Sequence, residues 1–306
     1  MKILASRRFP GPAWDELADV EYLQAGLPGG LVGPRQDVEA LAVVSETVDE
    51  RTLELLPRLR LVANYGAGYD SIDVAACSAR GVAVTNTPGV LTAATADLTL
   101  ALILAVRRRL VWADRVVREG RWTSAWADPD FLGRDVSGST LGIVGFGRIG
   151  QAVARRARGF EMRVVFTSRR RLDGVEWREL DELLAEVDIV SLHVPLSDET
   201  RGLLDATRLA LLRDGACLIN TARGQVVDER ALVRELVSGR IAAGLDVFAR
   251  EPRVPPELLG LPNVVLTPHV GSATTETREA MTRVLVDNLL AVERDEAPPN
   301  LVYPGA

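Results

Sequence analysis

A glycine-rich turn gives the first indication of chemistry in this sequence. The apolar run LGIV continues directly into a turn made of Gly145, Phe146, Gly147, Arg148, Ile149 and Gly150. The helical stretch QAVARRARGF follows. In such a strand, turn and helix, the first glycine permits the tight turn, the second lets the backbone approach a pyrophosphate, and the third lets helix and strand pack closely. With the N–H donors of the helix N-terminus, these six residues predict a dinucleotide-binding loop.

The end of the next apolar run, MRVVFTS, bears on which dinucleotide binds. NAD-binding folds carry an acidic residue about 20 residues beyond the glycine loop, where it binds the ribose 2′-hydroxyl. This chain instead has Ser168, Arg169, Arg170 and Arg171 there. A hydroxyl and guanidinium groups suit a 2′-phosphate, because arginine forms bidentate hydrogen bonds to phosphate oxygens. We predict that NADP(H) is preferred, with NAD(H) as the alternative if the arginines are only a solvated turn.

Three further segments place a polar side chain just beyond a predicted strand. Arg223 lies in NTARGQVVDE, Glu251 in LDVFAREP and His269 in TPHVGSAT. Parallel strands end at one edge of a sheet, and open α/β folds bind ligands at that edge. Each residue alone has an ordinary structural explanation, as does His193, which is as compatible with packing or cofactor contact as with catalysis. Together the three segments mark this edge as a candidate site.

The elements that must position these residues are strands and helices in alternation. Apolar runs at 2–6, 41–45, 59–64 and 82–85 form a first series. A second series covers 141–145, 163–167, 189–193, 216–220, 241–246 and 264–267. Between the two series we expect a long amphipathic helix from Ala94 through LTLALILAVRRRL and an irregular crossover over 120–133. This pattern predicts an α/β protein with two doubly wound parallel sheets.

Composition narrows the class of protein further. The chain has 306 residues, enough for about two domains, and 36 basic against 42 acidic residues give a net charge of −6. This balance disfavours nucleic acid as a partner. Cys77 and Cys217 lack the spacing of a zinc site, so we expect buried, reduced thiols and no metal. The apolar runs are too short for a signal peptide or a membrane span, which predicts a cytoplasmic protein with no membrane partner.

Seven stretches of the sequence together resemble one known family. They are NYGAGYDSID, TNTPGVLTAATADLTLAL, GIVGFGRIGQAVARRARGF, LHVPLSDET, INTARGQVVDE, GLDVFAREP and LTPHVGSAT. In this order they resemble the D-isomer-specific 2-hydroxyacid dehydrogenases, and most closely the glyoxylate/hydroxypyruvate reductase branch. The resemblance implies a Rossmann cofactor domain at 98–272. It also implies a flavodoxin-like, discontinuous substrate domain at 1–97 and 273–306, with the helix at 276–292 and the tail folding back.

The resemblance also implies roles for the candidate residues. His269 matches the proton donor to the substrate carbonyl oxygen, and Glu251 would pair with it and favour the imidazolium. Arg223 would hold the substrate carboxylate and polarise the carbonyl. The backbone amides of Ala67 and Gly68 would grip the same carboxylate, so that a small 2-oxo or 2-hydroxy acid would lie between the domains.

Further cofactor contacts follow from the same resemblance. Asp246 matches the residue that orients the nicotinamide carboxamide, and the remaining expected contacts are Thr221, Ala222, His269 and Gly271. Two positions depart from the family pattern. Asp130 stands where some members of the branch carry a second tryptophan, and the segment 241–244 is one residue shorter than usual.

The sequence therefore predicts NADPH-dependent reduction of glyoxylate or hydroxypyruvate to glycolate or D-glycerate. The alternative enzyme is another D-2-hydroxyacid dehydrogenase, including one acting on 3-phosphoglycerate, although the chain ends too soon after PPNLVYP for a C-terminal regulatory domain. The alternative outside enzymes is a dinucleotide-sensing scaffold or co-repressor. Trp122, Trp126 and Phe131 in the crossover would expose an apolar patch in a monomer, which predicts a homodimer.

Overall fold

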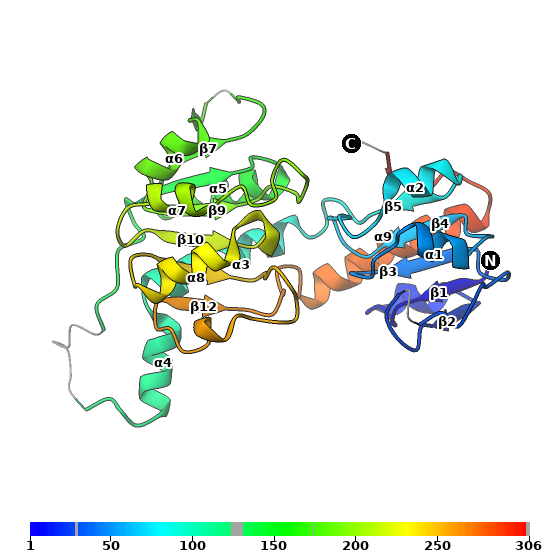
Figure 1. The fold of residues 1–306 in the computed structure, drawn as a ribbon, viewed down its shortest axis with the longest axis horizontal. Helices are drawn as coiled ribbons and strands as arrows, with labels where there is room; N and C mark the ends of the chain where they lie inside the picture. The colour runs from blue at the N-terminus through cyan, green and yellow to red at the C-terminus, as the bar shows by residue number, and fades with distance from the viewer. Residues whose placement is uncertain (28–29, 124–130, 173, 304–306) are drawn as a thin grey trace. The chain divides into compact units, whose positions relative to one another are not determined.

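The computed structural model describes residues 1–27, 30–123, 131–172 and 174–303 (Figure 1). The chain divides into two compact units, Met1–Leu91 with Ser272–Ala306 and Thr92–Gly271. We call them unit 1 and unit 2. Because unit 1 contains both ends of the chain, the expectation of a discontinuous domain is confirmed. The exact domain bounds given above stay a prediction.

The sheet of unit 1 has the strand order β13-β5-β4-β3-β1-β2. Its strands are β1 (Ile3–Ala5), β2 (Val20–Tyr22), β3 (Ala40–Val43), β4 (Leu61–Asn64), β5 (Ala83–Thr85) and β13 (Leu301–Val302). The first five strands are parallel and follow the flavodoxin-like order. β13 pairs antiparallel with β5. The prediction of a wholly parallel sheet is therefore wrong at this edge strand. β2 and β13 were not predicted, because edge strands of two or three residues show no periodicity.

Short helices and one long helix complete unit 1. They are η1 (Pro12–Glu16), α1 (Glu50–Leu55), α2 (Val74–Ala79) and α9 (Thr275–Glu293). Aspartate side chains cap α1 and α2, since Asp49 accepts from the Thr52 amide and Asp73 from the Ala76 amide. α9 packs on β4 and η1. The return of the final helix to the first sheet is therefore confirmed.

The sheet of unit 2 has seven parallel strands in the order β12-β11-β10-β9-β6-β7-β8. They are β6 (Thr140–Val144), β7 (Arg163–Thr167), β8 (Glu176–Trp177), β9 (Ile189–Leu192), β10 (Cys217–Asn220), β11 (Ala242–Leu245) and β12 (Val264–Leu266). The chain proceeds outward from β6 in one direction and from β9 in the other, which is the Rossmann order with its switch point between them. Only the two-residue strand β8 was not expected.

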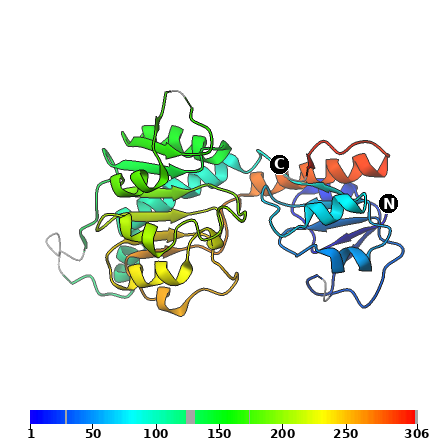
Figure 2. The ribbon, with the colours of Figure 1, turned by 45° about the horizontal axis from the view of Figure 1, so that its top comes forward.

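Helices cover both faces of this sheet (Figure 2). The helices are α3 (Thr92–Arg107), α4 (Leu110–Arg118), α5 (Arg148–Arg158), α6 (Leu180–Glu186), α7 (Ala206–Leu211) and α8 (Glu229–Val237), with short turns η3 (Gly224–Val226) and η4 (Pro256–Leu258). α3 and α5 contribute to the apolar core on one face, and α6, α7 and α8 to the core on the other. β9 and β10 are buried along their whole length, as central parallel strands should be.

The long helix expected to run through LTLALILAVRRRL is in fact two helices. α3 ends at Arg107, and α4 begins at Leu110. Between them, Arg109 has a left-handed φ of 51°. The Arg109 guanidinium lies 4.5 Å from the centre of the Trp112 ring. The arginine run therefore turns the chain, and α4 leaves the body of unit 2 (Figure 1).

The crossover residues of the predicted apolar patch differ in exposure. Phe131 is partly buried and packs against Trp112, with ring centres 5.0 Å apart. Trp122 is exposed. Trp126 and Asp130 lie outside the described residues.

Both cysteines are free and buried, as expected. Burial raises the pKa of Cys77 to about 11 and that of Cys217 to about 12, so both thiols stay protonated at neutral pH. Within the described ranges, the helices are all too short or too polar to cross a membrane.

Candidate active site

The glycine loop has the geometry that a dinucleotide phosphate requires. Gly145 has a φ of 93°, and a Cβ there would lie 2.7 Å from the carbonyl carbon of His193. A Cβ on Gly150 would lie 2.3 Å from the Gly145 oxygen, whereas a Cβ on Gly147 would meet nothing within 4 Å. The first and third glycines thus allow close packing, and the second leaves open space. No side chain of the described residues caps α5, which begins after Gly147, so its first amides face this space.

His193 lies at the switch point beside this loop. Its amide donates to the Val144 carbonyl over 2.7 Å, and its Nε2 lies 2.8 Å from the Ser191 hydroxyl. Desolvation lowers the pKa of His193 to about 3, so the ring is neutral at physiological pH. A permanently neutral imidazole that packs behind the glycine loop is a poor source of protons.

The turn after β7 carries arginines with different surroundings. The Arg171 guanidinium lies 3.8 Å from the centre of the Trp177 ring. Arg169 and Arg170 are exposed, and their guanidiniums have no hydrogen-bond or ion-pair partner in the part of the chain that the structure describes. The Ser168 hydroxyl donates to the Arg170 carbonyl. Two of the three cations thus remain available to an anion.

Arg223 lies on a turn after β10 that a buried asparagine holds. Asn220 is 2% exposed, its Oδ1 accepts from the Ala222 amide over 3.0 Å, and its Nδ2 donates to the Arg223 carbonyl over 2.9 Å. A Cβ on Gly224 would lie 2.0 Å from the carbonyl carbon of Phe248, so only glycine fits where the two backbones meet. The role of Asn220 was not predicted, although a polar residue at the end of an apolar strand, as in INTARG, is a usable signal.

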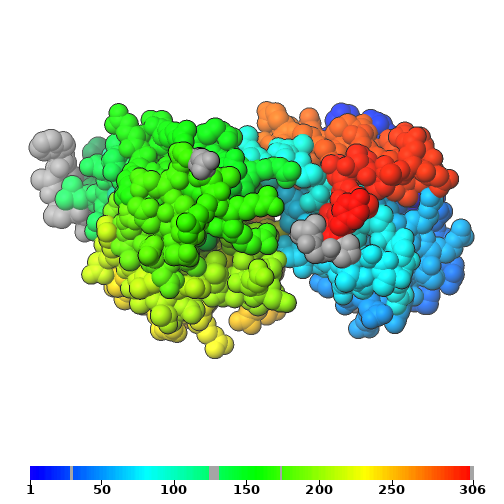
Figure 3. All heavy atoms as spheres, turned by 90° about the horizontal axis from the view of Figure 1, so that it is seen from above, coloured from blue at the N-terminus to red at the C-terminus, as the bar shows by residue number. Residues whose placement is uncertain are grey.

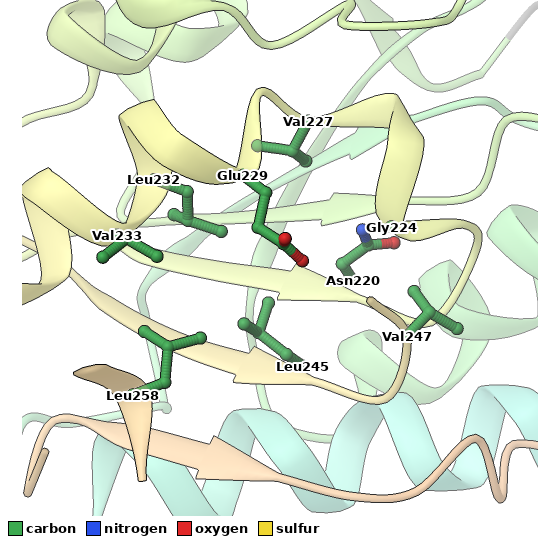
Figure 4. Close-up of a pocket in the computed structure, with 9 residues that line it drawn as sticks. All are labelled: Asn220, Gly224, Val227, Glu229, Leu232, Val233, Leu245, Val247 and Leu258. Atoms are coloured by element: carbon green, nitrogen blue, oxygen red, sulfur yellow. The ribbon is translucent and has the colours of Figure 1, made fainter. Parts of the chain in front are cut away.

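A small cavity lies behind this turn. The cavity lined by Asn220, Gly224, Glu229 and neighbouring apolar side chains has a volume of about 10 Å³, which is room for about one water molecule (Figure 4). Glu229 Oε1 accepts from the Ala249 amide over 2.9 Å, and Gln225 Nε2 donates to the Ala249 carbonyl over 3.0 Å. The Arg223 turn and the segment leading to Glu251 are therefore packed as one body.

Glu251 and His269 are in hydrogen-bond contact beside this turn. His269 Nδ1 lies 2.7 Å from Glu251 Oε2, and the Phe248 amide donates to Glu251 Oε1 over 3.1 Å. Burial alone would raise the pKa of Glu251, but the bond and charge of His269, the Phe248 amide and the charge of Arg223 together lower it. The carboxylate therefore stays charged. The structure brings all three sequence-predicted residues of the strand ends together.

Asp246 holds the loop that carries His269. It is 1% exposed, and its Oδ1 accepts from the Thr267 hydroxyl over 2.6 Å and from the Val270 amide over 2.8 Å. Its Oδ2 accepts from the Gly271 amide over 2.8 Å. Burial raises the pKa of Asp246 despite these bonds. These hydrogen bonds hold the loop in which His269 has a left-handed φ of 54°. Asp246 therefore fixes the backbone position from which the imidazole extends.

The short segment before Gly244 does not displace Asp246. β11 pairs residue by residue with β10, from Cys217↔Ala242 to Asn220↔Leu245. A Cβ on Gly244 would lie 3.0 Å from the Leu102 Cβ, so α3 approaches the strand closely there. The contact of Asp246 with the nicotinamide carboxamide stays a prediction.

In unit 1, asparagine side chains hold the loop of Ala67 and Gly68. Asn64 Nδ2 donates to the carbonyls of Gly66 over 3.1 Å and Gly68 over 2.8 Å, and Asn86 Nδ2 donates to the Ala67 carbonyl over 2.8 Å. The carbonyls of Gly66, Ala67 and Gly68 therefore all accept hydrogen bonds. The backbone amides of Ala67 and Gly68 have no hydrogen-bond partner among the described residues. They can therefore donate to an anion. Neither asparagine was singled out from the sequence.

Comparison with known proteins gives consistent matches. The family described as D-isomer specific 2-hydroxyacid dehydrogenase, NAD binding domain, matches residues 100–271. A glyoxylate reductase of Pyrococcus furiosus is 52% identical over 278 residues, covering 87% of this chain and 83% of that protein. A glyoxylate reductase of Thermococcus litoralis is 50% identical over 285 residues, covering 90% of this chain and 86% of that protein.

Solved structures agree with these matches. A crystal structure of an NADPH-dependent glyoxylate/hydroxypyruvate reductase of Sinorhizobium meliloti, in complex with NADP and malonate, superposes with a TM-score of 0.91. It is 36% identical, with 98% of this chain and 96% of that chain covered. A Thermus thermophilus protein superposes with a TM-score of 0.92 at 46% identity, with 99% and 100% covered.

Proposed function

Since the chain belongs to the D-isomer-specific 2-hydroxyacid dehydrogenase family and is an NAD(P)-dependent dehydrogenase, we propose that it reduces glyoxylate and hydroxypyruvate with NADPH. Glycolate and D-glycerate are then the products. Relatives that are 50–52% identical are glyoxylate reductases, which supports glyoxylate as a substrate. The observation that carries the mechanism is the hydrogen-bond contact between His269 and Glu251 beside Arg223.

His269 is the proposed proton donor. Its Nδ1 is engaged with Glu251, whereas Nε2 has no hydrogen-bond partner among the described residues and its side chain is 48% exposed. The charged carboxylate favours the imidazolium and fixes the ring, so Nε2–H is the group that can protonate the substrate oxygen. The nicotinamide, when bound, supplies the hydride.

Arg223 is the proposed anchor for the substrate. Its guanidinium is suited to a carboxylate and to the neighbouring carbonyl oxygen, where negative charge develops during reduction. The unpartnered amides of Ala67 and Gly68 are further donors for the carboxylate. Asn220 and Gly224 fix the backbone of the Arg223 turn. Less entropy is therefore lost when the guanidinium is positioned on the substrate.

The cofactor residues follow the strand ends of unit 2. The glycine loop and the first amides of α5 suit the pyrophosphate. Arg169 and Arg170 suit a 2′-phosphate, as does Ser168 when its hydroxyl turns from the Arg170 carbonyl to the phosphate. The further proposed contacts are Thr221, Ala222, Asp246, His269 and Gly271. The two unpaired guanidiniums support NADPH over NADH, because their charge is matched only by the phosphorylated ribose.

A direct test is the loss of NADPH absorbance with glyoxylate, hydroxypyruvate and pyruvate, repeated with NADH. We expect turnover of the first two acids and a higher kcat/KM with NADPH. Arg169→Ala should raise the KM for NADPH and leave kcat nearly unchanged, because the 2′-phosphate contact is the same in ground and transition states. Equal efficiency with both cofactors would contradict the cofactor proposal, and preferred turnover of 3-phosphoglycerate would contradict the substrate proposal.

A homodimer through unit 2 is the proposed assembly. The helix α4 and the segments beside it expose Leu110, Val111, Val117, Trp122 and Leu132, which are 52–72% exposed. Large exposed apolar side chains gathered on one helix and its flanking segments support an interface there. Light scattering at micromolar concentration should give the mass of a dimer, and a monomeric mass would contradict the proposal.

A further inference from the structure

Trp177 on the edge strand β8 contacts both ends of the arginine-bearing turn. Its Nε1 donates to the Ser168 carbonyl over 3.3 Å, and the Arg171 guanidinium carbon lies 3.8 Å from the centre of its ring. One side chain thus joins the first and last residues of the turn. We infer that Trp177 is a positioning residue that orders this turn and thereby sets the preference for NADPH over NADH. The inference rests on the proposed 2′-phosphate site.

The sheet fixes the indole in place. Trp177 pairs in register with Phe166 of β7, and the amide of Arg178 donates to the Phe166 carbonyl over 2.9 Å. The indole is half-buried and packs against the apolar core on the α3 and α5 face. A ring held on one side by this core can hold a turn on its other side.

Ion pairs tie the short strand β8 to its neighbours. Arg163 binds Glu176 over 2.6 Å and also Glu186, while Arg178 binds both carboxylates over 3.0 Å. The hydrogen bonds of Arg163 lower the pKa of Glu176 and Glu186, so both stay charged. Isolated surface pairs contribute little, but a closed network of four charges is a stronger restraint. It flanks Trp177 on both sides and explains how two residues form a strand.

The turn divides its three arginines into two roles. Arg171 lies on the indole, where a cation over an aromatic face is stabilised. Arg169 and Arg170 are exposed, and they belong to the green part of the chain that forms much of the face of unit 2 seen in Figure 3. The Ser168 hydroxyl closes the turn from inside through the Arg170 carbonyl. An ordered turn presents the two free guanidiniums at a lower entropic cost than a loose one.

The contacts would have a different consequence if the stack merely covered apolar surface. In that case its loss would lower the stability of the fold and affect NADPH and NADH alike. NADH lacks the 2′-phosphate, so it has no group that would bind the two guanidiniums at this turn. The two readings therefore differ in the ratio of the affinities for NADPH and NADH.

Isothermal titration of the full-length protein with NADPH and with NADH separates these readings. Trp177→Leu should weaken NADPH binding by about fivefold to tenfold, as expected for the loss of one cation–π contact and one hydrogen bond. NADH binding should change less than about twofold, which is within the effect of an ordinary surface substitution. Trp177→Phe keeps a ring for Arg171 without the N–H and should give a smaller loss. Arg171→Gln should also weaken NADPH selectively.

Controls make each outcome decisive. Leu172→Ala changes an exposed neighbour on the same segment and should leave both affinities unchanged. If Trp177→Leu fails to fold, Trp177→Phe and Arg171→Gln still test the inference. Equal losses for NADPH and NADH, or no loss, in these two variants would overturn it. If Arg169→Ala erodes the NADPH preference while the Trp177 variants do not, only this inference fails. If Arg169→Ala has no effect, the proposed 2′-phosphate site fails as well.

Discussion

Two polar regions at the strand ends of unit 2 are built in different ways. At the ends of β10 and β11, the buried side chains Asn220 and Asp246 fix the turns that carry Arg223 and His269. At the end of β7, exposed guanidiniums lie on a turn that one half-buried indole holds. The first region is held by buried hydrogen bonds, and the second lies on the surface and is held from one side.

The difference matches what each region has to do. Proton transfer requires a donor held in a fixed geometry, so small displacements cost much of the rate. Binding a phosphate requires charge and some order, and long arginine side chains adjust to the ligand. The comparison indicates that chemistry and cofactor choice can change independently in this protein.

The largest expected effect comes from removing the proposed proton donor in the clamped region. His269→Gln should lower kcat for glyoxylate by about 10²–10⁴, the usual contribution of a general acid. The dissociation constant for NADPH should change far less than kcat, because all the other proposed cofactor contacts remain. Stopped-flow NADPH oxidation and equilibrium titration measure the two quantities. A near-normal kcat with weakened NADPH binding would make His269 a cofactor residue instead.

A second variant tests the substrate anchor in the same region. Arg223→Ala should raise the KM for glyoxylate and lower kcat, because the guanidinium is proposed to hold the carboxylate and to polarise the carbonyl. We expect kcat/KM to fall by about 10²–10³, the range for loss of one donor to a developing oxyanion. Steady-state kinetics measure both constants. A change confined to KM would show that Arg223 binds substrate without assisting the reaction.

Removing Glu251, the partner of the proposed proton donor, should have a milder effect. Glu251→Gln keeps the imidazole but removes the charge that favours its protonated form. Reduction should therefore lose activity with rising pH earlier than in the parent, with a loss of kcat of about tenfold at neutral pH. A pH–rate profile between pH 5 and 9 measures this. An unshifted profile would contradict the role of the pair.

The last expected effect is on stability rather than on rate, at the switch point. The folded-state pKa of His193 is about 3 against an ordinary value of 6.5, so the unfolded chain binds the extra proton. Its neutral ring thus contributes stability that is present above pH 6.5 and lost as the pH falls toward 3, by at most about 1.4 kcal/mol per pH unit. Denaturant unfolding of His193→Gln should show a weaker loss of stability between pH 6.5 and 4.5. An identical decline in both proteins would contradict the burial of a neutral ring.

Much of the fold could be predicted because its signals are local. The apolar runs and the glycine loop fix the central strands and α5, and strand-end residues such as Arg223 and His269 follow from them. β8 was not predictable, because Trp177 becomes a strand residue only through pairing with β7 and distant ion pairs. The break at Arg109 was hidden because arginine is an ordinary helix residue, and its turn depends on tertiary packing.

The clamping residues show the same limit at the site. Asn220 and Asp246 end their strands in the sequence, yet their hydrogen bonds reach across turns that no periodicity describes. Asn64 and Asn86 act through amides that only the folded loop brings to the carbonyls of Gly66, Ala67 and Gly68. Candidate side chains can thus be proposed from type and position, whereas the hydrogen bonds that hold them are evident only from the fold.

The independence of the two regions is tested most directly by a double-mutant cycle. The parent, Glu251→Gln, Arg169→Ala and the double variant are compared by kcat/KM for NADPH at saturating glyoxylate. Glu251 and Arg169 share no contact partner among the described residues, so the two fold-changes should multiply, within about 0.5 kcal/mol. A double variant that departs from the product by more than about fivefold, a coupling of about 1 kcal/mol, would contradict the separation of chemistry from cofactor choice.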